Sequence, residues 1–257
     1  ADGQAQWKTR LSLDADARAE LAELTVSFIP GTIPSILETL PYLIQYPYGC
    51  VEQTLSTFLP AVWASAAAGE LHLPLPVKKA KLAEITDAGL KKLYGYQHGD
   101  GGWGWWSDDA TDLYMTAYTL WGLGEAAAAK IAVDRNVTKK GMRYLSEQLT
   151  VQRLTELKDT YATHRLLFAQ SVWVAASPKS ALTEKILADQ TSLLAGGVKQ
   201  PAGLALVLQT AVSAGNNELK RAALTALAAQ AKKDTAGTYF ESDDRNRYYW
   251  YNDREET

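Results

Sequence analysis

The chain has 257 residues, which is enough for one large domain or two small ones with a real hydrophobic core. Its net charge of −3, with no clustered Lys and Arg, argues against nucleic acid or an anionic membrane as a partner. A single cysteine cannot form an internal disulfide, three scattered histidines make a poor metal set, and no apolar run is long enough to span a bilayer. We therefore expect no metal and no cofactor.

The chain opens with the alternation of β-strands and then becomes helical. Residues 7–13 and 22–31 have period-two patterning, and the second segment ends on Pro-Gly, so we expect two strands. From residue 33 onward the period is that of helices. The predicted helices span 33–45, 51–69 with a kink at Pro60, 77–97, 113–129, 138–149, 161–176, 181–194, 201–215 and 217–233.

These helices differ in how they distribute apolar residues. Those at 113–129, 161–176 and 201–215 are apolar nearly all round and must be enclosed, whereas the helices between them have one polar face. Alternation of inner and outer helices is the pattern of stacked helical hairpins. If the hairpins close on themselves the fold is an α/α toroid, and if they stay open it is a solenoid.

Aromatic residues gather in two segments. The chain has 8 Trp and 13 Tyr against 4 Phe, concentrated at 94–106 and 245–253, and such clusters near glycine turns line the rim of a pocket. Segment 236–257 is a weak echo of 100–118, which leads into an inner helix. Because the chain stops where the second such helix begins, we expect a fragment of a longer polypeptide, incomplete at its C-terminus.

The only cysteine stands in "YPYGCVEQ" (46–53), immediately before a predicted helix. The positive end of the helix dipole favours the thiolate of Cys50, and the i,i+3 spacing places Gln53 on the same face of the first turn. A thiolate beside a carboxamide can expel ammonia and form an internal thioester. Such a bond lasts only where water is excluded. A buried, inert Cys50 and a Glu52 that serves the helix dipole are the alternative reading.

The segments "YPYGCVEQTLSTFLPAVW" and "YQHGDGGWGWWSDDATDLYMTAYTLWGL" resemble the thioester domain of the alpha-2-macroglobulin and complement family, most closely its bacterial members. The resemblance implies a mainly α, α/α-toroid domain over residues 32–257. Residues 1–31 would then be a β segment of an adjacent CUB-like domain. It also implies that Cys50 supplies the sulfur and Gln53 the acyl group, that Tyr46 and then Tyr48 shield the bond, and that Glu52 belongs to the motif.

The same resemblance implies a function. The domain would belong to a broad-range protease trap in the periplasm or cell envelope, lipid-anchored outside this chain, that captures proteases covalently through their lysine amines and is not a turnover enzyme. Some complement members place a histidine where this chain has Asp112, and they use it to transfer the acyl group to hydroxyls. Neither His98 nor His164 falls on that position, which implies direct attack by amines. His164, on an apolar face, is expected to be a core residue.

Three other readings stay open. The segment "QHGDGGWGW" also fits the repeat of terpenoid cyclases, but their acidic cluster is represented only by Asp108, Asp109 and Asp112, which read better as loop and N-cap residues. A glycosidase on the same fold would need two carboxylates across a cleft, and nothing in the sequence fixes such a pair. A helical interaction module with an inert cysteine is the third.

Overall fold

The computed structural model describes residues 39–44, 49–71, 76–157, 159–198, 200–235 and 237–241. The chain divides into two compact units, Ala1–Ile36 and Leu37–Thr257, and all described residues belong to the second. The strands predicted at 7–13 and 22–31, and the assignment of 1–31 to a neighbouring domain, lie outside the described residues. Of the helix predicted at 33–45, residues 39–43 are described and helical.

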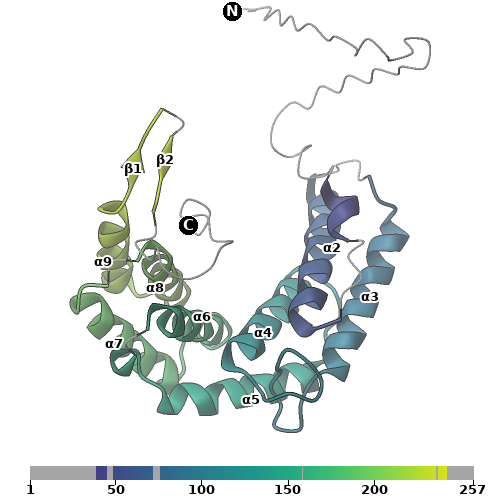
Figure 1. Cartoon of the computed structure of the whole chain (residues 1–257), viewed down its shortest axis with the longest axis horizontal. Helices are drawn as coiled ribbons and strands as arrows, with labels where there is room; N and C mark the ends of the chain where they lie inside the picture. Colours follow the sequence, from purple (N-terminus) through teal and green to yellow (C-terminus); the bar gives the residue numbers. More distant parts are fainter. Residues whose placement is uncertain are drawn as a thin grey trace, which may run out of the picture. The chain divides into compact units, whose positions relative to one another are not determined.

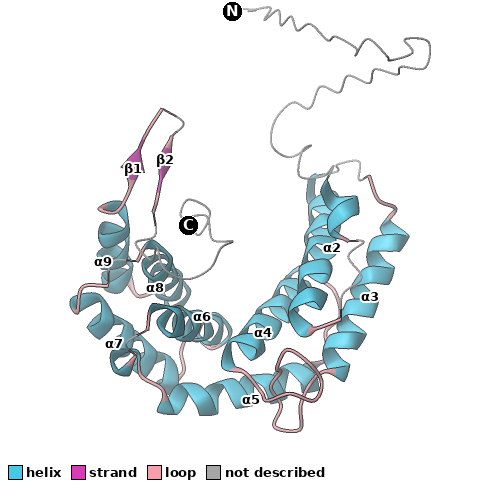
Figure 2. Cartoon of the chain, viewed as in Figure 1, coloured by secondary structure: helices cyan, strands magenta, loops and turns pink. Residues whose placement is uncertain are grey.

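The described part is mainly helical, as Figure 2 shows. The α-helices are α2 (Val51–Leu71), α3 (Lys79–Gly95), α4 (Leu113–Ala128), α5 (Arg135–Val151), α6 (Thr160–Ala176), α7 (Ala181–Ala195), α8 (Pro201–Ala214) and α9 (Asn217–Ala228). A 3-10 turn, η2 (Leu154–Glu156), follows α5. Helix α2 runs through Pro60 without ending there.

The helices form two layers of hairpins (Figure 1). Helices α2, α4, α6 and α8 contact one another in that order and make the inner layer. Each outer helix packs on the inner helix that precedes it: α3 on α2, α5 on α4, α7 on α6 and α9 on α8. This alternation confirms the predicted inner and outer helices and the mainly α fold of stacked hairpins.

Burial follows the two layers. Inner helix α4 buries residues on most of its faces, including Thr116 and Thr119, whereas outer helix α9 buries only Leu219 and Ala223 among its described positions. One hydrophobic core runs from α2 to α9, and its largest member is the fully buried Trp103. The core therefore includes a residue of the connection between α3 and α4 as well as residues of the helices.

Most helices begin at a side chain that caps them. Asp112, Asp134, Asp159, Ser180 and Asn216 each accept a backbone N–H of the first turn that follows, which satisfies donors that have no partner within the helix. Helix α8 begins instead with a proline, whose missing N–H costs nothing at that position.

The predicted helix at 217–233 is wrong in its last turn. Helix α9 ends at Ala228, and β1 (Lys232–Lys233) pairs antiparallel with β2 (Thr238–Tyr239). A turn drives the change: Asp234 N donates to Gly237 O at 3.0 Å, and Gly237, at φ 152°, donates to the Asp234 carboxylate at 3.1 Å. Lys232 and Lys233 fit a helix or a strand, and the turn between Asp234 and Gly237 favours the hairpin.

Candidate functional site

Cys50 and Gln53 meet at the start of α2. Cys50 N donates to Gln53 Oε1 at 3.2 Å, and Gln53 N donates to Cys50 Sγ at 3.4 Å. The two bonds close the first turn reciprocally, in the manner of a capping box, with sulfur in the place of the usual hydroxyl. The Cys50 side chain is buried, with 5% of its surface exposed. The thiol and the carboxamide thus lie against the same helical turn, as the i,i+3 spacing predicts.

The residue before the cysteine is held by the end of α3. Tyr96 donates its hydroxyl to Gly49 O at 2.6 Å, and the Lys92 ammonium lies 5.8 Å from the centre of the Tyr96 ring. A Cβ added to Gly49 would lie 4.0 Å from Lys92 Nζ and 3.5 Å from the Trp106 ring. An aromatic ring and a cation therefore lie beside Gly49, the residue that precedes Cys50.

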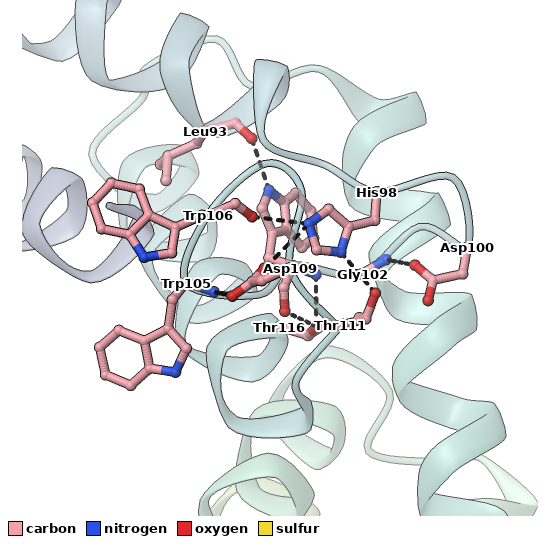
Figure 3. Close-up of polar contacts among 10 residues, drawn as sticks. Leu93, His98, Asp100, Gly102, Trp105, Trp106, Asp109, Thr111 and Thr116 are labelled. Carbon is pink, nitrogen blue, oxygen red and sulfur yellow. Dashed lines mark hydrogen bonds and ion pairs between the residues drawn. The ribbon is translucent and has the colours of Figure 1, made fainter. Parts of the chain in front are cut away.

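The connection from α3 to α4 covers residues 96–112, and Figure 3 shows polar contacts within it. Trp103 anchors it, because its buried Nε1 donates to Leu93 O at 2.7 Å and its backbone pairs with Asp112 in an isolated β-bridge. Farther along, Trp105 O accepts the N–H of Val51 at 2.9 Å. A loop carbonyl thus satisfies one of the free donors at the N-terminus of α2.

Glu52 points along α2. Ser56 donates its hydroxyl to Glu52 Oε1 at 2.7 Å. Burial raises the pKa of Tyr118 on α4, and the charges of Tyr114 and Glu52 raise it further. The structure therefore places the Glu52 carboxylate near Ser56 and Tyr118 and gives it no contact with the thiol.

Asp112 is engaged at both of its carboxylate oxygens. Its Oδ1 accepts from Met115 N at 2.8 Å, which caps α4, and its Oδ2 forms an ion pair with Arg165 of α6. The Arg165 guanidinium also lies 5.4 Å from the ring centres of Tyr114 and Tyr161. This is the N-cap role that the loop-and-cap reading of Asp112 expects.

The remaining candidates divide into two groups. Tyr46 and Tyr48 lie outside the described residues, so their shielding role stays a prediction. His164 lies on α6 against α8, where a Cβ on Gly203 would come within 3.3 Å of its Nε2, in keeping with a packing role. His98 belongs to the connection 96–112, with both ring nitrogens in contact distance of that loop.

Two further properties concern the described ranges alone. The described ranges contain no group of three or more His, Cys, Asp or Glu placed to hold a metal ion. Within the same ranges, the helices are either too short or too polar to cross a membrane.

The family of the chain follows from its sequence. A family model described as the A-macroglobulin TED domain matches residues 24–156, which include the Cys50 turn and the whole of 96–112. The chain belongs to this family. Its curated relatives include the alpha-2-macroglobulin of Thermotoga maritima, 37% identical over 164 residues, which covers 62% of this chain and 10% of the relative. The Escherichia coli alpha-2-macroglobulin is 28% identical over 145 residues, 53% of this chain and 9% of that protein.

Solved structures support the fold of this TED domain. The native conformation of E. coli alpha-2-macroglobulin matches 78% of this chain with a TM-score of 0.59 and 21% identity. Salmonella alpha-2-macroglobulin reacted with methylamine matches 79% with a TM-score of 0.59 and 21% identity. The described hairpins thus belong to the α/α-toroid class that the sequence predicts. Each solved chain is far longer, since the match covers 13% of it, and the chain spans about a tenth of its curated relatives.

Sequence reasoning missed two contacts of the Cys50 turn, from the Tyr96 hydroxyl and from the carbonyl of Trp105, and it missed the contact of His98 with Trp106. The aromatic cluster at 94–106 was a signal that this segment lines a rim, and it does lie against Gly49. Nothing in the sequence indicated which main-chain atom would reach α2.

Proposed function

We propose that Cys50 and Gln53 form an internal thioester and that this bond captures amines covalently. The observation that carries the proposal is the pair of reciprocal contacts in the first turn of α2, 3.4 Å from Gln53 N to Cys50 Sγ and 3.2 Å from Cys50 N to Gln53 Oε1. They keep a thiol and a carboxamide together without any strained backbone at either residue.

The bond forms by acyl transfer within the turn. The Cys50 sulfur attacks Gln53 Cδ, a C–S bond forms, the C–N bond breaks, and the amide nitrogen leaves as ammonia with the thiol proton. An incoming amine later attacks the same carbon, the C–S bond breaks, and the sulfur leaves with a proton from the amine. The Gln53 side chain ends as a substituted amide, so each molecule reacts once and does not turn over.

The surroundings suit a bond that must stay dry. Cys50 is 5% exposed, Val51 N–H is bound by Trp105 O, and the Trp106 ring lies next to Gly49. Exclusion of water prevents hydrolysis of a reactive acyl group. We assign further shielding to Tyr46 and Tyr48 on the strength of the family resemblance.

The engagement of Asp112 supports amines as the nucleophiles. Both of its oxygens are occupied, by Met115 N and by Arg165, so it is poorly placed to take a proton from a weaker nucleophile such as a hydroxyl. A neutral lysine amine needs no such assistance. We therefore propose lysine side chains as the targets.

In the full-length protein we propose that this domain, inserted next to a CUB-like segment, serves a protease trap. Target proteases would be the covalent partners, and the neighbouring domains of the same polypeptide would keep the bond covered until cleavage. We place that protein in the periplasm or cell envelope, anchored by a lipid outside this chain. These statements rest on membership of the family and on the alpha-2-macroglobulins that it resembles.

Intact mass before and after methylamine tests the bond. A thioester lowers the native mass by about 17 Da through loss of ammonia, and methylamine then adds about 31 Da and releases one thiol. Gln53→Glu is the matched control, because its side chain has nearly the same size but lacks an amine to expel. Its mass should equal that of the sequence, and Cys50 should titrate freely.

A wild-type chain with the full sequence mass and a freely titrating Cys50 would contradict the thioester. The trap is tested in the full-length protein, where trypsin treatment should give an adduct that resists boiling in detergent. If the Gln53→Glu or the Cys50→Ala protein gave the same adduct, covalent capture through this bond would be excluded.

A further inference from the structure

The turn at Trp105 and Trp106 touches the residues on both sides of Cys50. Trp105 O accepts from Val51 N at 2.9 Å, and the Trp106 ring lies 3.5 Å from the position of a Cβ on Gly49. The turn therefore lies against the main chain that carries the buried thiol.

His98 holds the carbonyl of this turn (Figure 3). Its Nε2 lies 2.9 Å from Trp106 O, and its Nδ1 lies 2.8 Å from Thr111 Oγ1. A carbonyl oxygen only accepts, so Nε2 carries the hydrogen. In the neutral ring Nδ1 accepts from the Thr111 hydroxyl, and in the protonated ring it donates to the same oxygen. The bond to Trp106 O is thus compatible with both charge states.

Asp109 binds the other side of the turn. Its Oδ2 accepts from Trp105 N at 2.8 Å, and its Oδ1 lies 3.6 Å from His98 Nε2. The fit around this carboxylate is close, because a Cβ on Gly104 would lie 1.9 Å from Asp109 Oδ1. The amide of Trp105 and the carbonyl of Trp106 are therefore bound by two side chains that also face each other.

His98 is itself fixed to the scaffold that carries Cys50. Its backbone N donates to Gly102 O at 2.9 Å and its carbonyl accepts from Gly101 N at 3.0 Å. Two residues earlier, Tyr96 is bonded to Gly49 O. The imidazole is largely buried, with 11% of its side chain exposed. A short, well-connected path thus joins the end of α3, the imidazole, the tryptophan turn and the first turn of α2.

We infer that His98 is a positioning residue that keeps the Trp105–Trp106 turn on α2 and thereby limits the access of water and small reagents to Cys50. It acts through the turn and touches no reacting atom. The inference deepens the proposed function, and its meaning for thioester lifetime rests on that function. The covering of Cys50 itself does not depend on whether the thioester forms.

The first test therefore uses a protein that cannot form the bond. In the Gln53→Ala background Cys50 is a free thiol, and its rate of alkylation by iodoacetamide reports access to it. His98→Asn removes the donor at the Nε2 position and should speed alkylation about fivefold to tenfold, the factor expected for loss of one such hydrogen bond. His98→Gln carries an amide N–H near that position and should stay within about twofold of its parent.

A second histidine controls for general loosening. His164→Asn removes a half-buried imidazole from α6, away from the tryptophan turn, and should leave the alkylation rate of Cys50 unchanged. The inference is overturned if His98→Asn alkylates no faster than its parent. It is also overturned if His98→Gln or His164→Asn opens Cys50 as much as His98→Asn does.

The second test addresses the thioester directly. With Gln53 in place, His98→Asn should lose the 17 Da mass deficit of the thioester about fivefold to tenfold faster than wild type in amine-free buffer, and His98→Gln should not. A wild-type chain that never shows the deficit contradicts the proposed function, while the alkylation rates still decide the role of His98. Equal hydrolysis rates in wild type and His98→Asn count against the inference alone.

Discussion

The connections 96–112 and 196–200 have the same place in the topology, since each leads from an outer helix into an inner one. The short one turns with backbone hydrogen bonds, such as Gly197 N to Leu194 O at 3.1 Å, and delivers the chain to Pro201. The long one carries a buried tryptophan, three glycines in tight contacts (Gly101, Gly102 and Gly104) and a histidine bonded at both ring nitrogens. The hairpin fold requires only a short turn, and the longer connection also contacts Gly49 and Val51 on either side of Cys50.

The largest effect expected from this contrast concerns Trp103. Trp103→Ala removes a fully buried ring and its hydrogen bond to Leu93 O, and it should lower the free energy of unfolding by about 3–5 kcal/mol. Leu204→Ala, equally buried on α8, should cost about 2–5 kcal/mol. Only Trp103→Ala should accelerate alkylation of Cys50 in the Gln53→Ala background. Equal acceleration by Leu204→Ala would show that general instability, and not the connection, governs access.

Two glycines at positive φ give a matched pair of smaller effects. Gly101 has φ 99°, and a Cβ there would lie 2.7 Å from Lys140 O, whereas Gly197 has φ 83° and open space around it. Gly197→Ala should cost about 1–2 kcal/mol from backbone conformation alone. Gly101→Ala adds a clash with backbone and should cost about 3 kcal/mol or more. Urea unfolding of both variants measures the difference, and equal costs would mean that 96–112 packs less tightly than its contacts indicate.

A buried polar group also lies in the second half of the molecule, among α6, α7 and α8. It provides a comparison for the connection 96–112. Gln190 donates to Gln170 Oε1 at 2.9 Å and to Thr210 Oγ1 at 3.3 Å, joining α6, α7 and α8. Gln190→Leu leaves Gln170 Oε1 without this donor and should cost about 1–3 kcal/mol in thermal unfolding. Because these helices are remote in sequence from the Cys50 turn, methylamine reactivity should not change. A changed reactivity would show that the two halves of the molecule are coupled more tightly than we expect.

The smallest expected effect appears at high pH. Burial raises the pKa of Tyr118, and burial with nearby Asp100 and Asp112 raises that of Tyr144. Above the ordinary tyrosine pKa of 10.0 the unfolded tyrosines lose their protons while the folded ones retain them, so this contribution to stability is fully present below pH 10.0 and is lost as pH rises through the higher folded pKa. Tyr118→Phe and Tyr144→Phe should each make the fall of the unfolding free energy with pH shallower above about pH 10. Unchanged slopes in both variants would remove these tyrosines from the alkaline response.

The sequence was sufficient for the parts of the fold that depend on periodicity. Inner and outer helices differ in how many faces are apolar, and this difference can be recognised from the sequence. The pairing of Cys50 with Gln53 was also predictable, because one helical turn fixes the distance between positions i and i+3. The end of α9 was not, since Lys232 and Lys233 fit a helix or a strand and the Asp234–Gly237 turn decided between them.

The contacts that surround Cys50 could not be predicted for a different reason. Trp105 reaches Val51 through a main-chain carbonyl, and a carbonyl is the same in every residue. His98 does not stand where complement members have their histidine, so the resemblance gives it no role, yet its ring bonds the tryptophan turn. Such roles depend on how the loop folds back, which no local pattern encodes.

The bond from Val51 N to Trp105 O has one more consequence, for the way relatives of this chain diverge. Since main-chain atoms make it on both sides, exchanging the side chain at either position leaves donor and acceptor in place, except that proline at position 51 would remove the donor. Adding or deleting a residue between Trp103, whose ring is fixed in the core, and Asp109 would carry the carbonyl away from α2. This contact therefore constrains the number of residues in the segment more than their identity. We expect an alignment of homologues to show no insertions or deletions there.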